Sequence, residues 1–333
     1  MSIVNHQNSL VIPVLGPSEV AAAAKVLRDG GLLGLPTETV YGLAANAESA
    51  EAVSRIYFVK GRPQDHPVIV HIASIDQLSS WARDIPDYAL SLAREFWPGP
   101  MTLVLKRTDR VEDFITGGQD TVGLRIPQHP IALAVIAEFG GGVAAPSANR
   151  FGGVSPTNAH HVIQDLSDRL DSDSDAVIDG GESEVGVEST IIDCTSTHPR
   201  VLRLGAVTVA DIERVTGLSV EEPDDAIRAP GTLASHYSPH ATVLLAHTVE
   251  EMEHSMSELI SNRHIGVIAL EKFQTPRGSI RLAMPQDAAE YAASLYAALW
   301  EADRQGLDYV VALVPEGADI AAAVRDRLTR AAH

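Results

Sequence analysis

Four basic side chains stand next to short polar loops at separate points along the sequence: Lys60, Arg62, Arg125 and Arg203. Guanidinium and ammonium groups form charge-assisted hydrogen bonds with phosphates and carboxylates. The neighbouring loops are rich in hydroxyls and small residues, which would let a ligand approach the backbone closely. Together these segments predict a site for a polyphosphate and a carboxylate rather than for a hydrophobic ligand.

Arg125 lies in the middle of a predicted strand over 121–126. Thr121, Gly123 and Arg125 alternate along one face of that strand. If the face is covered, the guanidinium needs an anionic partner. The alternative is an edge strand whose arginine faces solvent, so the pattern leaves two interpretations open.

Three further loops carry hydroxyls and small residues. A strand over 32–35 leads into the sequence PTET, after which the chain is expected to turn at Gly42. The other two loops are 144–149, with the sequence AAPSAN, and 188–190, with the sequence EST. Taken singly each has an ordinary structural explanation, such as a strand exit or, for Thr157, a helix N-cap.

Several well-known catalytic motifs do not occur in the sequence. There is no GxxxxGK[ST], no HExxH and no GxSxG, and the glycines at 140–142 do not open a GxGxxG helix. Cys194 is the only cysteine, which excludes an internal disulfide framework and a CxxC zinc site. His160 and His161 fall in a polar helix and are expected at the surface.

The elements that must position these residues alternate between helical and extended patterns, which predicts an α/β fold. In the first part we expect strands at 32–35, 68–72, 101–105, 121–126, 143–145, 176–178, 189–193 and 201–204. Helices are expected at 19–28, 49–59, 75–83, 86–96, 130–139 and 157–166. Strands 242–246, 265–270, 279–283 and 309–314 alternate with helices 249–262, 287–303 and 319–330 in the second part, which indicates mainly parallel crossovers.

Composition restricts the function class. The chain has 333 residues, enough for two domains, and a formal net charge of -19. Such a charge disfavours tight binding to bulk nucleic acid, so we expect weak or no direct contact with it. The N-terminal residues do not form a secretory signal, and no apolar run is long enough to span a membrane. We therefore expect a cytoplasmic protein without a membrane partner.

In order along residues 20–205, the segments PTETVYGL, KGRPQDHPVIVH, WPGPMTLVL, TVGLRIP, APSAN, GVESTIID and LRLG resemble the YrdC-type threonylcarbamoyl-AMP synthases. The sequence HYSP at 236–239 and the pattern that follows resemble the linker and C-terminal domain of the long form of that family. The resemblance implies a twisted mixed-sheet YrdC-like domain plus a smaller Rossmann-like α/β domain. The implied boundaries are 1–208 for the catalytic domain, 209–240 for a linker or lid, and 241–333 for the C-terminal domain.

The resemblance also implies an activity and its site. L-threonine, bicarbonate and ATP would be condensed to threonylcarbamoyl-AMP, which a threonylcarbamoyl transferase would then use to modify tRNA. Mg²⁺ would arrive with ATP, without a metal site on the protein. The residues implied for L-threonine are Thr39, His71, Arg125, Ala145 and Ser189. Those implied for ATP are Lys60, Arg62, His66, Thr121, Ser147, Ser155, Arg203 and Tyr237, of which Lys60 and Arg62 are also expected to be catalytic. The linker, 221–240, is expected to close over the nucleotide.

Two rival functions remain to be weighed against this one. The first is a carbamoyl-adenylate-forming maturation factor, which would be expected to carry zinc-finger cysteines that this chain lacks. The second is a non-catalytic double-stranded-RNA-binding or ribosome-associated module. That function would require a concave cationic surface, which the net charge disfavours.

Overall fold

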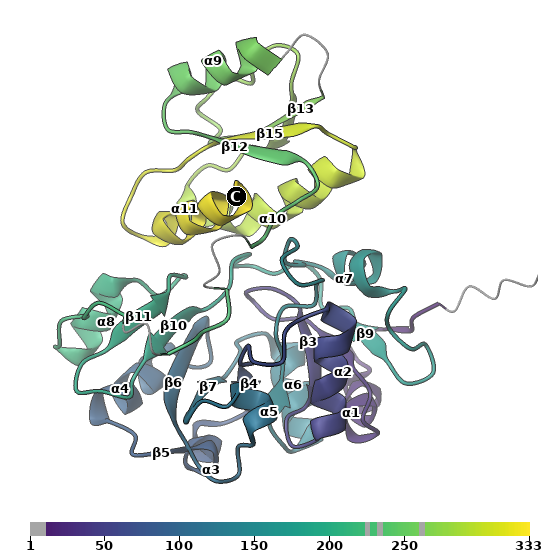
Figure 1. Ribbon diagram of the computed structural model, residues 1–333, viewed down its shortest axis with the longest axis vertical. Coiled ribbons are helices and arrows are strands. Elements are labelled where there is room, and N and C mark those ends of the chain that lie inside the picture. The colour runs from purple at the N-terminus through teal and green to yellow at the C-terminus, as the bar shows by residue number, and fades with distance from the viewer. Residues whose placement is uncertain (1–10, 224–226, 232–235, 260–263) are drawn as a thin grey trace, which may run out of the picture.

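The structure, a computed structural model, is organised around two β-sheets (Figure 1). The described residues are 11–223, 227–231, 236–259 and 264–333. Figure 1 shows the smaller sheet with its helices stacked against one side of the larger unit. The predicted α/β class, with a mixed sheet followed by a smaller parallel sheet, is confirmed.

The larger sheet is mixed. Its strands are β1 (Val14–Leu15), β2 (Leu33–Leu35), β3 (Gly42–Asn46), β4 (Val70–His71), β5 (Ala82–Arg83), β6 (Met101–Arg107), β7 (Thr121–Arg125), β8 (Val143–Ala144), β9 (Ala176–Ile178), β10 (Thr190–Asp193) and β11 (Arg200–Arg203). They run in the order β1-β9-β2-β3-β8-β4-β7-β6-β10-β11, with β5 beside β6. The strand that carries Arg125 is therefore central, between β4 and β6, and the edge-strand alternative is wrong.

Helices cover this sheet and bury its apolar side chains. They are α1 (Val20–Arg28), α2 (Ala50–Lys60), η1 (Ile75–Gln77), α3 (Leu78–Trp81), α4 (Asp87–Phe96), α5 (Asp113–Thr116), α6 (Pro130–Phe139), α7 (Ala159–Leu166) and α8 (Val209–Thr216). Helices α1 and α6 pack together over one hydrophobic core. A second and larger core includes buried residues of α2, α4 and α8, so α8 packs with the larger unit although it falls within the predicted linker.

Local signals at the ends of α2 place two of the predicted basic residues. Ser49 caps the helix by accepting a hydrogen bond from the Ala52 backbone N–H. The helix ends at Gly61, which adopts the left-handed conformation with φ of 64°. This ending leaves Lys60 on the last helical turn and directs Arg62 into the following loop.

The structure departs from the predicted elements at several places. The expected turn at Gly42 is instead the start of β3, which pairs with both β2 and β8. The strand was missed because its sequence, GLAAN, has little β-propensity and is held by its neighbours. The expected helix 75–83 is η1 and α3 followed by β5, and the N-cap of α7 is Asn158 rather than Thr157.

The smaller sheet consists of β12 (Thr242–Ala246), β13 (Ile265–Ile268), β14 (Ile280–Ala283) and β15 (Tyr309–Leu313), in the order β12-β15-β13-β14. All three pairings are parallel, as expected for crossover connections. Its helices are α9 (Val249–Leu259), α10 (Ala288–Arg304) and α11 (Ile320–Ala331). Residues 260–262 of the predicted helix 249–262 lie outside the described residues. Helices α10 and α11 lie on the side that faces the larger unit (Figure 1).

Contacts between the two units correct one expectation about the surface. The His161 side chain is buried, and its ring stacks on Trp300 of α10 with centroids 5.0 Å apart. Burial, together with the nearby His160, lowers the pKa of His161 to about 4. His161 was expected at the surface because the polar pattern of its helix gives no sign that a second domain covers it.

Candidate functional site

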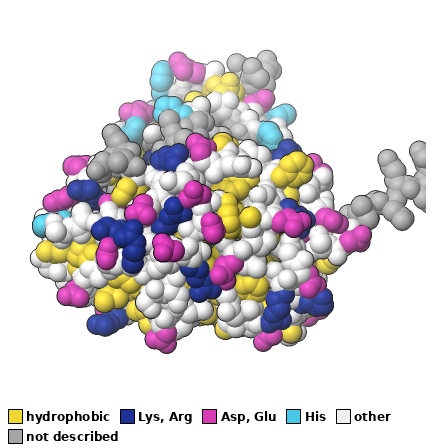
Figure 2. Space-filling view, turned by 60° about the horizontal axis from the view of Figure 1, so that its bottom comes forward, with side chains coloured by type: hydrophobic (Ala, Val, Ile, Leu, Met, Phe, Trp, Pro, Cys, Tyr) yellow, Lys and Arg dark blue, Asp and Glu magenta, His cyan; other side chains and the backbone are white. Residues whose placement is uncertain are grey.

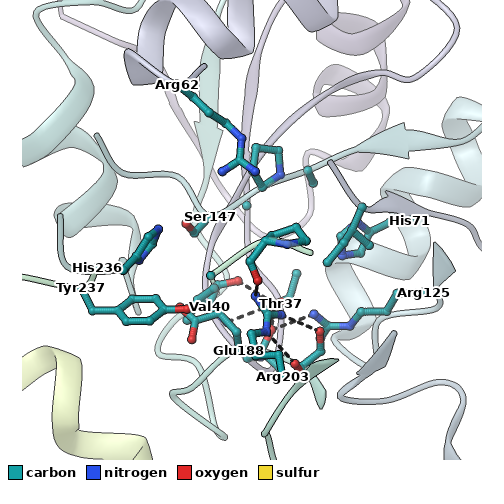
Figure 3. Close-up of a pocket in the computed structure, with 18 residues that line it drawn as sticks. Thr37, Val40, Arg62, His71, Arg125, Ser147, Glu188, Arg203, His236 and Tyr237 are labelled. Atoms are coloured by element: carbon teal, nitrogen blue, oxygen red, sulfur yellow. Dashed lines mark hydrogen bonds between the residues drawn. The ribbon is translucent and has the colours of Figure 1, made fainter. Parts of the chain in front are cut away.

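A cavity lies at the junction of the sheet ends, the loop 36–42 and the segments 230–231 and 236–237 (Figure 3). It brings together nine of the residues predicted from the sequence: Thr39, Arg62, His71, Arg125, Ala145, Ser147, Ser189, Arg203 and Tyr237. Segments that are far apart in the sequence therefore meet at one place, and the wall combines guanidinium groups with hydroxyls and small residues.

The loop after β2 is fixed by its own hydroxyls. The Thr37 hydroxyl donates to the Val40 carbonyl at 2.6 Å and accepts from the Val40 backbone N–H at 3.2 Å. It also lies 2.8 Å from the Thr39 hydroxyl. Gly42 follows at a tight approach, where a Cβ atom would come within 3.1 Å of the Ala145 Cβ. The loop therefore holds Thr39 rigidly at the cavity wall.

Arg125 is buried and already has a carboxylate partner. Its guanidinium donates to Glu38 at 2.6 Å, to the Thr39 hydroxyl at 2.9 Å and to the Gly99 carbonyl at 3.2 Å. The anionic partner that a covered strand requires is thus a residue of the protein, which the sequence analysis did not identify. A guanidinium has five N–H donors, so two remain for a ligand after these three bonds.

His71 lies beside Arg125, since β4 and β7 pair in register at these two residues. Burial, with the nearby charge of Arg125, lowers the pKa of His71 to about 3. Its imidazole is therefore neutral at physiological pH. The Nδ1 atom is buried and finds no hydrogen-bond partner among the described residues, which leaves it able to contact a ligand.

Ser189 and Arg203 form another part of the cavity wall. Arg203 donates to the Ser189 carbonyl at 3.0 Å, to its hydroxyl at 3.1 Å and to the Pro230 carbonyl at 3.1 Å. The Ser189 hydroxyl also lies 2.8 Å from that of Thr102. These partners of Arg203 are neutral, so its positive charge is not cancelled by any of them.

The two basic residues at the end of α2 take different positions. Arg62 lines the cavity, with its guanidinium 5.8 Å from the centroid of the Phe151 ring. Its Nε atom is buried and unpartnered within the described part of the chain. Lys60 lies behind the wall, where it donates to the Ser147 carbonyl at 2.6 Å and to the Asn149 carbonyl. Burial, with the nearby Arg62, lowers the pKa of Lys60 to about 7.

Three other predicted ATP residues also stand apart from the cavity. Thr121 lines a smaller adjoining cavity under Arg228 and Pro230. The ring of His66 lies edge-on to Phe151, with centroids 5.4 Å apart. Ser155 is fully buried and donates to Glu188 at 2.6 Å. In the geometry described here, these residues and Lys60 support the wall or border it.

The linker contributes directly to the cavity. Pro230, Gly231, His236 and Tyr237 line it, and Tyr237 adopts the left-handed region with φ of 64°. The Tyr237 ring is almost fully buried, yet its hydroxyl has no hydrogen-bond partner among the residues described. Residues 224–226 and 232–235 of the predicted lid lie outside the described residues.

Sequence reasoning missed two buried carboxylates: Glu188, which lines the cavity, and Glu38, which accepts a hydrogen bond from the cavity residue Arg125. Glu38 stands between two threonines and Glu188 stands between a valine and a serine, and each precedes a predicted ligand-binding residue. That pattern could have identified them, because a carboxylate between buried neighbours needs a cation. Instead, attention to the cations alone left their protein partners unassigned.

The described residues hold no group of three or more His, Cys, Asp and Glu side chains placed to bind a metal ion. Glu38 and Glu188 are each paired with an arginine, Arg125 and Arg327. In the part of the chain described, no helix is long and apolar enough to cross a membrane.

Comparison with known proteins adds a second line of evidence. The family model Sua5_yciO_yrdC, described as telomere recombination, matches residues 25–205, and the threonylcarbamoyl-AMP synthase C-terminal domain matches 207–333. The threonylcarbamoyl-AMP synthase of Pyrococcus abyssi is 40% identical over 94% of each chain. That of Bacillus subtilis is 37% identical over 94% of this chain and 93% of the relative.

Solved structures agree over the whole length. Pyrococcus abyssi Sua5 complexed with L-threonine superposes with a TM-score of 0.86 at 39% identity, covering 97% of both chains. A variant of the same protein with an adjacent histidine and tyrosine replaced by alanine gives a TM-score of 0.87 at 38% identity, covering 97% of this chain and 96% of that one.

The two sheets, and the arginine-lined cavity that the first domain and the linker form, fit a two-domain α/β enzyme of the nucleotidyltransferase class. Both matched models and the full-length relatives agree with that class. The chain belongs to the Sua5 family of threonylcarbamoyl-AMP synthases, in its two-domain form.

Proposed function

We propose that this chain condenses L-threonine, bicarbonate and ATP into threonylcarbamoyl-AMP and pyrophosphate. The observation that carries the proposal is the composition of one cavity. Arg125, Thr39 and Ser189 provide a subsite for an amino acid, and Arg62 and Arg203 provide cations for phosphates. The family's name and the L-threonine in a related structure support the same assignment.

Charge distribution divides the cavity into two parts. The Arg125–Glu38 pair is internally neutral, so the two remaining N–H groups of Arg125 can orient a carboxylate without adding a strong net field. Arg62 donates to the Pro67 carbonyl at 2.9 Å, and Arg203 donates to the Ser189 and Pro230 carbonyls, so the hydrogen-bond acceptors of both cations are neutral. We assign the threonine carboxylate to the first part and the ATP phosphates to the second.

The chemistry proceeds in two steps. The threonine amine attacks CO2 derived from bicarbonate, a C–N bond forms and a proton passes to solvent, giving N-carboxy-threonine. An oxygen of the new carboxylate then attacks the α-phosphorus of ATP, and the bond to the β-phosphate oxygen breaks to release pyrophosphate. The protein contributes alignment and neutralisation of the phosphate charge rather than a covalent nucleophile.

We also propose roles for Lys60, for Mg²⁺ and for a downstream transferase. Lys60 would hold the 147–149 loop through its hydrogen bonds to the Ser147 and Asn149 carbonyls. Its ammonium would contact ATP only after these two hydrogen bonds had broken. Mg²⁺ would arrive with the nucleotide, because the described carboxylates do not form a metal site. The product is a mixed anhydride, so we propose that a threonylcarbamoyl transferase acting on tRNA consumes it soon after release.

Pyrophosphate release tests the assignment. We expect release to require L-threonine and bicarbonate together with ATP, and to fall to background when either is omitted. A coupled phosphate assay with each substrate left out in turn measures this, with L-serine in place of L-threonine as a specificity control. Equal release without threonine would contradict the proposed function.

The nucleic-acid alternative has less support. On the face that Figure 2 displays, basic side chains are interspersed with acidic ones. Arg83 lies 2.9 Å from Asp120, and Arg107 lies 2.6 Å from Asp113. A surface that binds RNA without sequence preference instead gathers its basic groups into a patch or stripe.

We also propose that the described linker residues cover bound nucleotide and that the Tyr237 hydroxyl contacts ATP. A buried hydroxyl without a partner costs stability, and a ligand acceptor would satisfy it. The neighbouring residues Arg228 and Pro230 line the same small cavity as Thr121, so the linker borders both cavities. Covering the site would also protect the adenylate from water.

Tyr237→Phe should raise the KM for ATP by about 10-fold, the usual value of one hydrogen bond. The melting temperature should stay unchanged or rise, because the removed hydroxyl has no partner in the described protein. Tyr291→Phe is the matched control, since that hydroxyl donates only to the Ile268 carbonyl within the C-terminal domain. An unchanged KM for ATP in Tyr237→Phe would remove the proposed contact.

A further inference from the structure

The C-terminal domain reaches a carboxylate in the wall of the catalytic cavity. Glu188 lines the cavity and is only 6% exposed. It accepts from the Arg327 Nε at 2.8 Å and from the Tyr296 hydroxyl at 3.0 Å, and both of these residues are fully buried. A third hydrogen bond comes from Ser155 at 2.6 Å. We call these four residues, Ser155, Glu188, Tyr296 and Arg327, the cross-domain clamp.

Arg327 is fixed on several sides. Its Nη2 donates to the Leu204 carbonyl at 2.8 Å, next to Arg203 in the sequence, and its Nη1 donates to Asp326 at 2.5 Å. The guanidinium carbon lies 5.3 Å from the centroid of the Tyr237 ring. Helix α11 therefore contacts a cavity carboxylate, the strand end that carries Arg203, and the linker tyrosine through one side chain.

Tyr296 on α10 completes the same arrangement. Its ring lies 5.6 Å from that of Tyr237, with an angle of 31° between the planes. On the same helix, the Trp300 indole donates to the Ser155 carbonyl at 3.2 Å. The face of α10 and α11 that is turned toward the larger unit thus forms the back of the cavity wall rather than a remote contact.

Within the clamp, Glu188 pairs with Arg327 and not with Arg203. Arg203 and Glu188 both line the cavity, and the two groups attract each other electrostatically. Arg203 nevertheless donates hydrogen bonds to the Ser189 and Pro230 oxygens, while Arg327 forms the salt bridge with the Glu188 carboxylate. Burial alone would raise the pKa of Glu188, but the charges of Arg327 and Arg203 and the Ser155 hydrogen bond lower it to about 2. A carboxylate that stays ionised needs a cation close by.

We infer that Arg327 and Tyr296 are positioning residues of the active site, which hold the Glu188 carboxylate away from Arg203 and so keep the Arg203 guanidinium available for the phosphates of the nucleotide. The inference deepens the proposed function, because it concerns the same cavity and the same substrate. It gives the C-terminal domain a defined part in catalysis. Without Arg327, the carboxylate would turn to Arg203, the other cation that faces it, and neutralise it.

A set of variants tests the inference through nucleotide affinity. Arg327→Gln should raise the KM for ATP by about 10-fold or more, with a smaller effect on the KM for threonine. Adding Glu188→Gln should restore the KM for ATP to within about 3-fold of the wild-type value, because an amide does not neutralise Arg203. If Arg327 had a purely structural role, adding Glu188→Gln would instead impair the enzyme further, since it removes one more buried acceptor oxygen.

Controls separate the clamp from general destabilisation. Arg325→Gln lies on the same helix, where Arg325 donates to the Pro315 carbonyl within the C-terminal domain, and should leave the KM for ATP unchanged. Tyr296→Phe keeps every charge and should raise the KM for ATP by about 3-fold even if Arg327→Gln fails to fold. Melting temperatures of all variants show which of them are folded.

Titration calorimetry with a non-hydrolysable ATP analogue distinguishes this inference from the proposed function. Absence of pyrophosphate release in the wild type would overturn the proposed function, while the analogue would still report the affinity of the clamp variants. Two results would overturn the clamp. They are unchanged analogue affinity in folded Arg327→Gln or Tyr296→Phe, and a double variant that binds no better than Arg327→Gln.

Discussion

Arg125→Ala should raise the threonine concentration that gives half-maximal rate by about 30- to 1000-fold, equivalent to about 2–4 kcal/mol. Arg125 is only 4% exposed, and after it has bonded to Glu38, Thr39 and Gly99 two of its N–H groups have no acceptor among the described residues. Those donors are matched to a carboxylate, and water does not replace them in a buried site. Titration calorimetry with L-threonine and steady-state pyrophosphate release measure the change.

The structure adds a complication that determines the controls for Arg125→Ala. Removing the guanidinium leaves Glu38 as an unpaired buried carboxylate, which is strongly destabilising. The double variant Arg125→Ala with Glu38→Gln relieves that charge and should be better folded while remaining poor in threonine binding. Arg125→Lys should rescue only in part, because a point charge does not reproduce the planar fork. Unchanged threonine affinity in folded Arg125→Ala would contradict the assigned subsite.

Much of the fold was predictable because local signals and packing agree. The helix at 130–139 is observed with the same bounds, since Pro130 starts it and Gly140 ends it. The strand β3 was not predictable, because small residues with weak β-propensity become a strand only through pairing with β2 and β8. The strand conformation of residues 42–46 is therefore set by tertiary pairing rather than by the local sequence.

In the candidate site, too, some features were predictable from the local sequence and others depend on tertiary contacts. The cations were identifiable because an arginine in a strand or between small residues is conspicuous in the sequence. Which cation pairs with which carboxylate was not identifiable, since Glu188 meets Arg327 from 139 positions away, a pairing that only the folded chain reveals. The burial of His161 under Trp300 has the same cause. These two missed contacts lie where the C-terminal domain packs on the catalytic one, whereas the missed strand β3 and the Arg125–Glu38 pair lie within the catalytic domain.

Replacing Arg203 is expected to have the second large effect, a loss of catalytic efficiency with ATP. We expect Arg203→Ala to lower kcat/KM for ATP by about 100- to 1000-fold, because a cation preorganised for phosphate charge stabilises the transition state as well as binding. The guanidinium is 8% exposed and is held by the Ser189 and Pro230 carbonyls, so it needs little rearrangement when ATP enters.

The measurement is pyrophosphate release over a range of ATP concentrations at saturating threonine and bicarbonate. Arg200→Ala is the matched control, since Arg200 lies on the same strand but is directed to Asp193 and Glu221 outside the cavity. Arg203→Lys should recover part of the rate, because a lysine ammonium also binds phosphate, although as a point charge. If folded Arg203→Ala kept its kcat/KM for ATP and lost threonine affinity instead, the division of the cavity into an amino-acid part and a phosphate part would have to be reversed.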